Sequence, residues 1–294
     1  MAFKQRRDGE YVTTLPALRR VIPYLMPTRG ESTVYFPMRI EADGLLAWLD
    51  RVNEGRPEPE HIGIFHVLLT AAARTLELRP EMNRFVAGRR TYQHREKSVS
   101  FVVKTEMDDA APETEVRLVF TGDESVEQVR DLCNEAVARK RSRPSGRDDR
   151  LVAFFTSWPR PVLRMIARLI RTLDYHNVLP GFFRDAIPLY TSVYVVNTGS
   201  IGIDPPYHHL YEHGTASAFV SIGRITPRPV VDARGKVVAR NCLDVVFTLD
   251  ERATDGFYMA RTAEVIRRLV ADPDLLGKQG ITVDELLAGW PNGE

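Results

Sequence analysis

The chain has 294 residues, of which 44% are hydrophobic and 27% charged, with a formal net charge of +1. A chain of this length can bury a sizeable core, and its near-zero charge excludes a general electrostatic attraction to nucleic acid or to an anionic membrane. Its two cysteines, Cys133 and Cys242, do not form a disulfide framework and favour a reducing compartment. The N-terminus lacks the apolar core of a signal peptide. We therefore expect a cytoplasmic protein without a transmembrane segment or a nucleic-acid partner.

Strand-like and helix-like patterns alternate along the chain. Runs of β-branched and aromatic residues predict strands at 32–42, 99–105, 114–120, 189–197, 215–224, 228–232 and 242–249. Apolar residues at helical spacing predict helices at 43–53, 62–80, 123–143 and 257–271. The helix at 62–80 is apolar nearly all round, so it should lie in the core. This order predicts a mixed α/β (α+β) fold in which helices cover a sheet.

Residues 144–188 are predicted to form a helical insertion. The stretch PVLRMIARLIRTL (161–173) places apolar side chains on one face and spreads Arg164, Arg168 and Arg171 toward the other. Three interpretations remain open: a packed helix that lines a pocket, an oligomer contact, or a basic amphipathic helix on a membrane surface. We favour packing or an oligomer contact, since amphipathic helices of this kind are usual in soluble proteins.

Four short stretches carry a family resemblance. They are RPEMNRFVAG (79–88), FVVKTE (101–106), VNTGSIGID (196–204) and DERATDG (250–256). In this order they resemble the catalytic domain of the dihydrolipoyl acyltransferases of 2-oxo acid dehydrogenase complexes and the related chloramphenicol acetyltransferase. The resemblance covers roughly residues 19–271 apart from the insertion. It implies a chloramphenicol-acetyltransferase-like fold, with a mixed β-sheet covered by helices.

The resemblance also implies a mechanism. Similar proteins are homotrimers whose active sites lie in channels between subunits, where CoA or acyl-CoA meets a small-molecule acyl acceptor. In the family, the histidine of a His-x-x-x-Asp-Gly motif removes the proton from the attacking group, and a serine stabilises the oxyanion. Aligned on Asp255-Gly256 and on Asn197, the histidine position here is Glu251 and the serine position is Val196. A glutamate with a pKa of ~4.3 is a weak base toward a thiol, and valine donates no hydrogen bond.

The remaining motif residues each have a structural and a catalytic interpretation. Glu251 is either a strand-end carboxylate that pairs with Arg252 or another arginine, or a base toward water that would favour thioester hydrolysis. Asp255 is expected to cap the backbone at 257–258, where a helix begins. Asn197 is expected near the oxyanion.

The stretch DPPYHHLYEHG (204–214) gathers three of the seven histidines. His208 or His209 is a candidate for a relocated general base, because imidazole titrates in the useful pH range. A loop that packs a subunit interface is an equally good interpretation. The same stretch matches His-x-x-Glu-His at His209, Glu212 and His213, which on a helix would present two zinc ligands on one face. Against zinc, no third ligand is evident.

The sequence leaves three functions open. The first is an acyltransferase that uses CoA or another thioester as substrate, with a base drawn from His208, His209 or Glu251. The second is a catalytically inactive trimeric scaffold or regulatory homologue, and the third is a zinc hydrolase. We expect residues 1–294 to form one catalytic-like domain without a lipoyl domain, a subunit-binding domain or a covalent lipoyl group.

Overall fold

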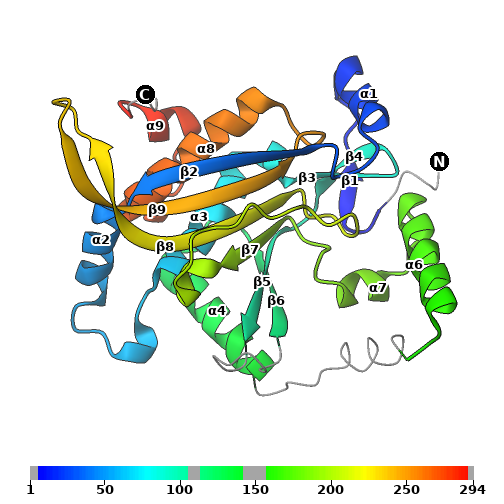
Figure 1. Cartoon of the computed structure of the whole chain (residues 1–294), viewed down its shortest axis with the longest axis horizontal. Helices are drawn as coiled ribbons and strands as arrows, with labels where there is room; N and C mark the ends of the chain where they lie inside the picture. Colours follow the sequence, from blue (N-terminus) through cyan, green and yellow to red (C-terminus); the bar gives the residue numbers. More distant parts are fainter. Residues whose placement is uncertain (1–5, 105–112, 142–156, 291–294) are drawn as a thin grey trace.

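Six strands form a central mixed sheet in the computed structural model, which describes residues 6–104, 113–141 and 157–290 (Figure 1). The strand order is β2-β9-β8-β7-β5-β6. Strand β7 runs parallel to both of its neighbours, and the other neighbouring strands are antiparallel. The bounds are β2 Thr33–Glu41, β5 Lys97–Lys104, β6 Glu113–Phe120, β7 Val193–Asn197, β8 Ala218–Val231 and β9 Val237–Asp250. The predicted mixed sheet is confirmed.

Helices cover one face of this sheet (Figure 1). The longer helices are α1 Ala17–Leu25, α2 Asp43–Asn53, α3 Ile64–Leu78, α4 Val126–Arg141, α6 Arg160–Tyr175 and α8 Gly256–Ala271. The shorter ones are α7 Gly181–Ala186 and α9 Val283–Leu287, with 3₁₀ turns at Glu58–Glu60, Pro80–Asn83, Thr198–Ile201 and Pro273–Gly277. Helices α2, α3, α4 and α8 share one hydrophobic core with the sheet. The expectation that α3 lies in this core is confirmed. None of the described helices is long and apolar enough to cross a membrane.

A small second sheet packs beside the first. It contains β1 Gly9–Tyr11, β4 Arg90–His94 and β3 Arg84–Ala87 in that order. The turn between β3 and β4 contains Gly88, whose φ of 54° lies in the left-handed region. A Cβ atom at Gly88 would stand 2.2 Å from the carbonyl oxygen of Tyr175 in α6. Only glycine therefore allows this close approach of the hairpin to the insertion.

The structure differs from the sequence prediction in the strands after residue 215. The ranges 215–224 and 228–232 form one strand, β8, with an irregular register between Ile222 and Ile225. Strand β7 reaches only the level of Ile222, so among the described strands the rest of β8 pairs with β9 alone. Prolines are tolerated in such a strand because one edge is open. The outer parts of β8 and β9 form a protruding hairpin, which is held by backbone hydrogen bonds between the two strands while most of its side chains are not buried. Alternating hydrophobicity marks strands with one buried face, so it did not reveal the length of this hairpin.

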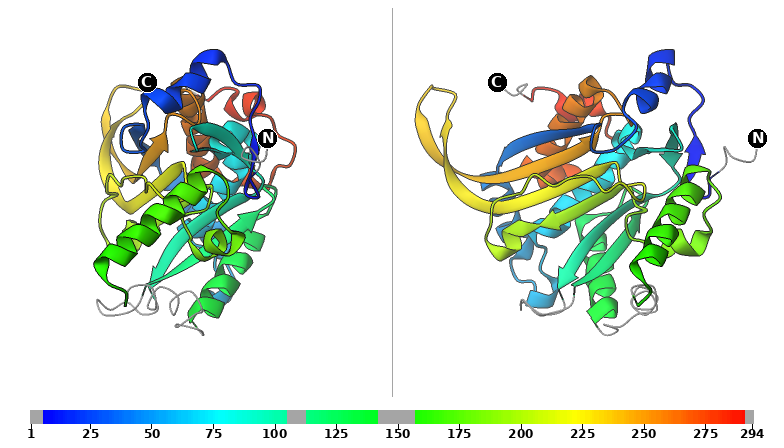
Figure 2. Two further views of the ribbon diagram at one scale, coloured as in Figure 1. Left: turned by 90° about the vertical axis from the view of Figure 1, so that its right-hand side faces the viewer. Right: turned by 45° about the vertical axis from the view of Figure 1, so that its right-hand side comes forward.

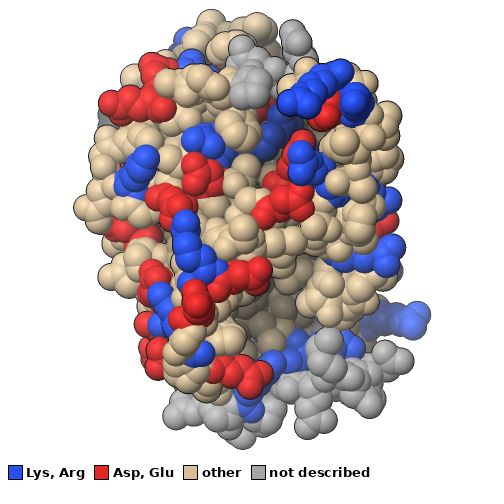
Figure 3. Space-filling model, turned by 90° about the vertical axis from the view of Figure 1, so that its left-hand side faces the viewer, with Lys and Arg blue, Asp and Glu red and all other residues tan. Residues whose placement is uncertain are grey.

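Opposite charges intermingle on the side of the molecule shown in Figure 3. At the base of the β8–β9 hairpin, Asp244 pairs with Arg39 at 2.7 Å and with Arg228 at 3.5 Å. Asp204 likewise pairs with Arg224 and Arg228. The surface in this region is therefore neither predominantly positive nor predominantly negative.

His94 is a buried histidine at the end of β4. Its ring lies 4.3 Å from that of Phe85, and its Nε2 is 3.4 Å from the carbonyl oxygen of Thr215. Burial lowers the pKa of His94 to about 4, against the opposing effect of the Asp8 carboxylate. The ring is therefore neutral in the folded protein at neutral pH.

We expect His94 to make the protein less stable in mild acid. The unfolded chain takes up a proton on this side chain near pH 6.5 and the folded chain only near pH 4, so stability falls as pH drops through this window. Between pH 7 and pH 5 the loss amounts to about 2 kcal/mol of unfolding free energy. Urea unfolding at both pH values measures it, and His94→Gln should remove most of the difference. An unchanged difference in the variant would assign the acid sensitivity to other groups.

Candidate functional site

The motif DERATDG forms the turn between β9 and α8. Strand β9 ends at Asp250, and α8 begins at Gly256 with Asp255 as its N-cap residue. The carboxylate of Asp255 accepts a hydrogen bond from the Tyr258 amide at 2.8 Å. The predicted capping role is confirmed. It fixes the direction in which the chain leaves the sheet.

A buried ion pair holds this turn together. Asp250 and Arg252 are joined by two hydrogen bonds between the guanidinium and the carboxylate, at 2.9 and 2.8 Å. Their side chains are 0% and 5% exposed. The interpretation that Glu251 pairs with Arg252 is therefore wrong. After Asp250 the chain turns, with the Ala253 amide donating to the Asp250 carbonyl at 3.0 Å, and this turn brings the Arg252 guanidinium onto the Asp250 carboxylate.

Glu251 is half-buried, and its backbone is tied down on both sides. Its amide donates to the Ser32 carbonyl at 3.0 Å, and its carbonyl accepts from the Arg19 guanidinium at 3.1 Å. Within residues 6–104, 113–141 and 157–290, its carboxylate forms no hydrogen bond or ion pair. The position that resembles the family histidine thus presents a carboxylate that is available to a ligand or to another chain.

Asn197 ends β7 and caps the 3₁₀ turn Thr198–Ile201. Its side-chain oxygen accepts a hydrogen bond from the Ser200 amide at 3.2 Å. Among the described residues its side-chain NH₂ group has no partner, so it remains available as a donor. Val196, at the serine position, is partly buried beside a small apolar cluster that contains Tyr194 and Phe219.

The sheet register separates Asn197 from Glu251. Asn197 pairs with Ile222 on β8, whereas the Asp250 amide donates to the Ser217 carbonyl just before β8 begins. Five residues of extended chain lie between these two levels, which corresponds to about 17 Å. A single chain therefore does not bring these two candidate residues into one site.

The segment 203–217 crosses the sheet face that the helices leave open (Figure 1). Val193 and Val195 of β7 belong to the core beneath the helices, whereas Tyr194 packs with Leu210 and Phe219 in a separate cluster. Alternating residues of a strand point to opposite faces, so this second cluster lies on the outer face. The candidate histidines are carried across that face.

His208 is the better oriented of the two candidate bases. Its ring stacks in parallel on Phe219 with 3.9 Å between the ring centroids, and Thr248 of β9 donates to its carbonyl. Its Nδ1 lies 2.8 Å from the carbonyl oxygen of His209. Because a carbonyl only accepts, Nδ1 carries the proton of the neutral ring, which leaves a lone pair on Nε2. His209 is exposed and stacks against His208.

The helical premise of the zinc site is wrong. Residues 203–217 contain no helix, so His209 and His213 do not share a helical face. The Glu212 carboxylate accepts hydrogen bonds from the amides of Arg29 and Gly30, at 2.9 and 3.2 Å. In the part of the chain that the structure describes, no three His, Cys, Asp or Glu side chains are grouped so that they could hold a metal ion.

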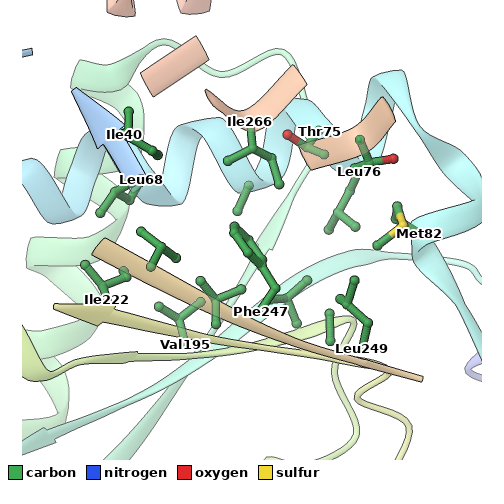
Figure 4. A pocket seen from close by; sticks show the side chains of 16 residues that line it. Ile40, Leu68, Thr75, Leu76, Met82, Val195, Ile222, Phe247, Leu249 and Ile266 are labelled. Carbon is green, nitrogen blue, oxygen red and sulfur yellow. The ribbon is translucent and has the colours of Figure 1, made fainter. Parts of the chain in front are cut away.

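A cavity of about 60 Å³ lies between the sheet and the helices α3 and α8. Side chains such as Leu68 and Ile266 point into it from the helices, and Val195 and Phe247 point into it from the sheet (Figure 4). Its lining contains no ionisable side chain. The cavity therefore cannot supply a general base and belongs to the core.

Comparisons with known proteins identify the fold. Residues 191–277 match the family described as 2-oxoacid dehydrogenases acyltransferase (catalytic domain). A dihydrolipoamide acetyltransferase of Azotobacter vinelandii is similar with 16% identity and a TM-score of 0.57, over 91% of this chain and 94% of that chain. The chain has this acyltransferase catalytic-domain fold. The resemblance inferred from the sequence is thereby confirmed.

Two further structures share the acyltransferase fold. A probable dihydrolipoamide acetyltransferase of Listeria monocytogenes has 16% identity and a TM-score of 0.53, over 94% of this chain and 99% of that chain. A truncated catalytic core of the 2-oxoacid dehydrogenase multienzyme complex of Thermoplasma acidophilum has 15% identity and a TM-score of 0.55, over 90% and 100%. No curated protein sequence matches the chain.

Sequence reasoning missed the charged residues that hold the acyltransferase-like turn. Asp250 and Arg252 flank Glu251, and the buried Arg29 donates to the carbonyls of Gly214 and Ala216, which ties the histidine segment to the sheet. The signal in the sequence was an aspartate that ends an apolar strand with an arginine two positions later, in the turn that follows. Nothing local in the sequence around Arg29 pointed to its carbonyl partners.

Proposed function

We propose that the protein transfers an acyl group from CoA or another thioester to a small-molecule acceptor, at a site formed between copies of the chain. The observation that carries the proposal is the family match over residues 191–277, which includes both Asn197 and the turn 250–256. The separation of Asn197 from Glu251 within one chain supports a shared site, because a second subunit can bring one residue to the other. A homotrimer is the assembly that the family resemblance implies.

In the proposed reaction His208 is the general base. Its Nε2 takes the proton from the thiol or hydroxyl of the acceptor, which then attacks the thioester carbonyl carbon. The negative charge on the carbonyl oxygen is stabilised by the side-chain NH₂ of Asn197 from a neighbouring copy of the chain, in place of the missing serine. The carbon–sulfur bond breaks, and the departing CoA thiolate recovers the proton from His208.

Glu251 is the second candidate for the base. In the Azotobacter enzyme a serine, a histidine and an asparagine were investigated for roles in the catalytic mechanism, and that histidine and asparagine stand four residues apart. Glu251 and Asp255 have the same spacing. The carboxylate of Glu251, which pairs with no other described residue, supports a role at the site as a general base toward water, and the reaction would then be hydrolysis of the thioester.

Titration calorimetry of the purified protein with CoA and acetyl-CoA tests the proposal, together with the molar mass from light scattering. We expect saturable binding with one site per chain in a trimer. A protein that forms the trimer but binds neither molecule would contradict acyl transfer from CoA and support the scaffold function. Binding to a monomer would contradict the shared site.

A further inference from the structure

Helix α6 carries two parallel rows of unlike side chains. Arg160, Arg164 and Arg168 recur every fourth residue, and Met165 and Leu169 follow one residue behind them. Residues four apart lie one above the other on a helix, and consecutive residues are rotated by about 100°. The arginine row and the apolar row therefore run side by side along the helix.

The body of the protein covers only part of the apolar surface of α6. Val162, Leu163, Ile166, Ile170 and Leu173 are partly buried, and no residue of the helix is fully buried. Met165 and Leu169 remain 62% and 54% exposed. One side of the helix packs against the protein, as the sequence pattern predicted, but the row of Met165 and Leu169 faces outward.

The exposed charges of α6 are all positive. Arg160, Arg164, Arg168 and Arg171 are exposed and form no ion pair with any other described residue. The acidic residue of the helix, Asp174, is paired with the buried Arg6 at 3.0 Å. The hairpin side of the molecule, in contrast, mixes both signs of charge (Figure 3).

The C-terminal end of α6 is fixed to the body. In addition to the pair between Arg6 and Asp174, the side-chain NH₂ of Asn177 donates to the hydroxyl of Tyr92 at 2.8 Å. Figures 1 and 2 show the helix at one end of the molecule, beside α7. The two rows are therefore presented at the surface by a folded part of the protein.

We propose that α6 docks the protein on the surface of an anionic lipid bilayer. The apolar row enters the boundary between headgroups and acyl chains, and the neighbouring arginines bind lipid phosphates. This inference is independent of acyl transfer, because it uses no residue of the proposed active site.

An anionic bilayer fits both rows together. Nucleic acid would use the arginines but leave Met165 and Leu169 in water. A second copy of the chain would have to offer an acidic surface to four arginines that pair with no other described residue, and two acidic side chains beside the hairpin, Asp204 and Asp244, are already paired with arginines. A lipid bilayer offers phosphates to the arginine row and acyl chains to the apolar row in one surface.

Flotation of the full chain with vesicles tests the proposal. We expect binding to vesicles of phosphatidylcholine mixed with phosphatidylglycerol and little binding to phosphatidylcholine alone. Raising the salt from about 0.1 M to about 1 M shortens the screening length from ~10 Å to ~3 Å and should release the protein. The double variant Arg164→Gln/Arg168→Gln should bind about 25-fold more weakly, at about fivefold for each arginine. Leu169→Asp should weaken binding at least about tenfold.

Helix α4 offers matched controls, because it also exposes a leucine and an arginine, Leu132 and Arg139. Leu132→Asp and Arg139→Gln should bind vesicles like the unmodified protein, and circular dichroism checks that all variants are folded. Equal binding to neutral vesicles, or no binding to anionic ones, would overturn the proposal. If the protein does not bind vesicles and an α6 variant lowers its molar mass, then the surface of α6 contacts a second copy of the chain instead of a bilayer.

Discussion

Asp250→Asn should lower the free energy of unfolding by about 3–5 kcal/mol, which is the usual cost of removing one partner from a buried ion pair. Asp250 is completely buried and holds Arg252 through two hydrogen bonds. Arg29 is also fully buried, and the negative charge of Asp250 acts against the burial that lowers its pKa. An asparagine would therefore leave the Arg252 guanidinium without its carboxylate and remove a negative charge that acts on the buried Arg29. Urea unfolding monitored by circular dichroism measures the loss.

Asp204 provides a matched control for this prediction. It also meets two arginines, Arg224 and Arg228, but its side chain is 52% exposed. Water and salt screen such a pair, so Asp204→Asn should leave the unfolding midpoint almost unchanged. If both variants lose the same stability, burial does not set the cost at Asp250, and the turn is held by other contacts.

His208→Ala should lower the turnover of the thioester by about 10²–10⁴-fold, the range expected when a general base is removed. The measurement is the release of the CoA thiol from acetyl-CoA in the presence of a small thiol acceptor. The pH profile of kcat/KM should lose its acidic limb in the variant, because the group whose protonation stops the reaction is absent. A variant that merely disturbed packing would keep the shape of this profile.

Variants of His209 and Glu251 distinguish between the candidate general bases. The Nδ1 of His208 is held by the backbone carbonyl of His209, which His209→Ala retains, so this variant should keep most of the activity. Glu251→Gln removes the charge at the family histidine position with little change in size. If His208→Ala keeps full activity and Glu251→Gln abolishes it, then Glu251 is the base.

Local patterns in the sequence were enough to predict the strands of the central sheet, the helices packed on it and the fold class, but not the small sheet of β1, β3 and β4 or the helix α1. The helix at Asp43–Asn53 and the strand at Thr33–Glu41 follow from apolar spacing, and the cap at Asp255 follows from an acidic residue just before a helix. These features depend on residues within a few positions of one another, where periodicity and capping act. The four short stretches that resemble the acyltransferases are also local, so they could be recognised without knowledge of the tertiary structure.

The tertiary structure decided which of the candidate residues belong together. The register of β8 with β7 and β9 places Asn197 and Glu251 about 17 Å apart along the strands, and no local pattern fixes that register. The proton position on His208 depends on a carbonyl brought within hydrogen-bond distance by an irregular segment. The sequence by itself determined the rows on α6, and only the packing of the chain decided that Met165 and Leu169 stay exposed. Partner choice and exposure depend on contacts between residues far apart in the chain, so they become visible only once the fold is complete.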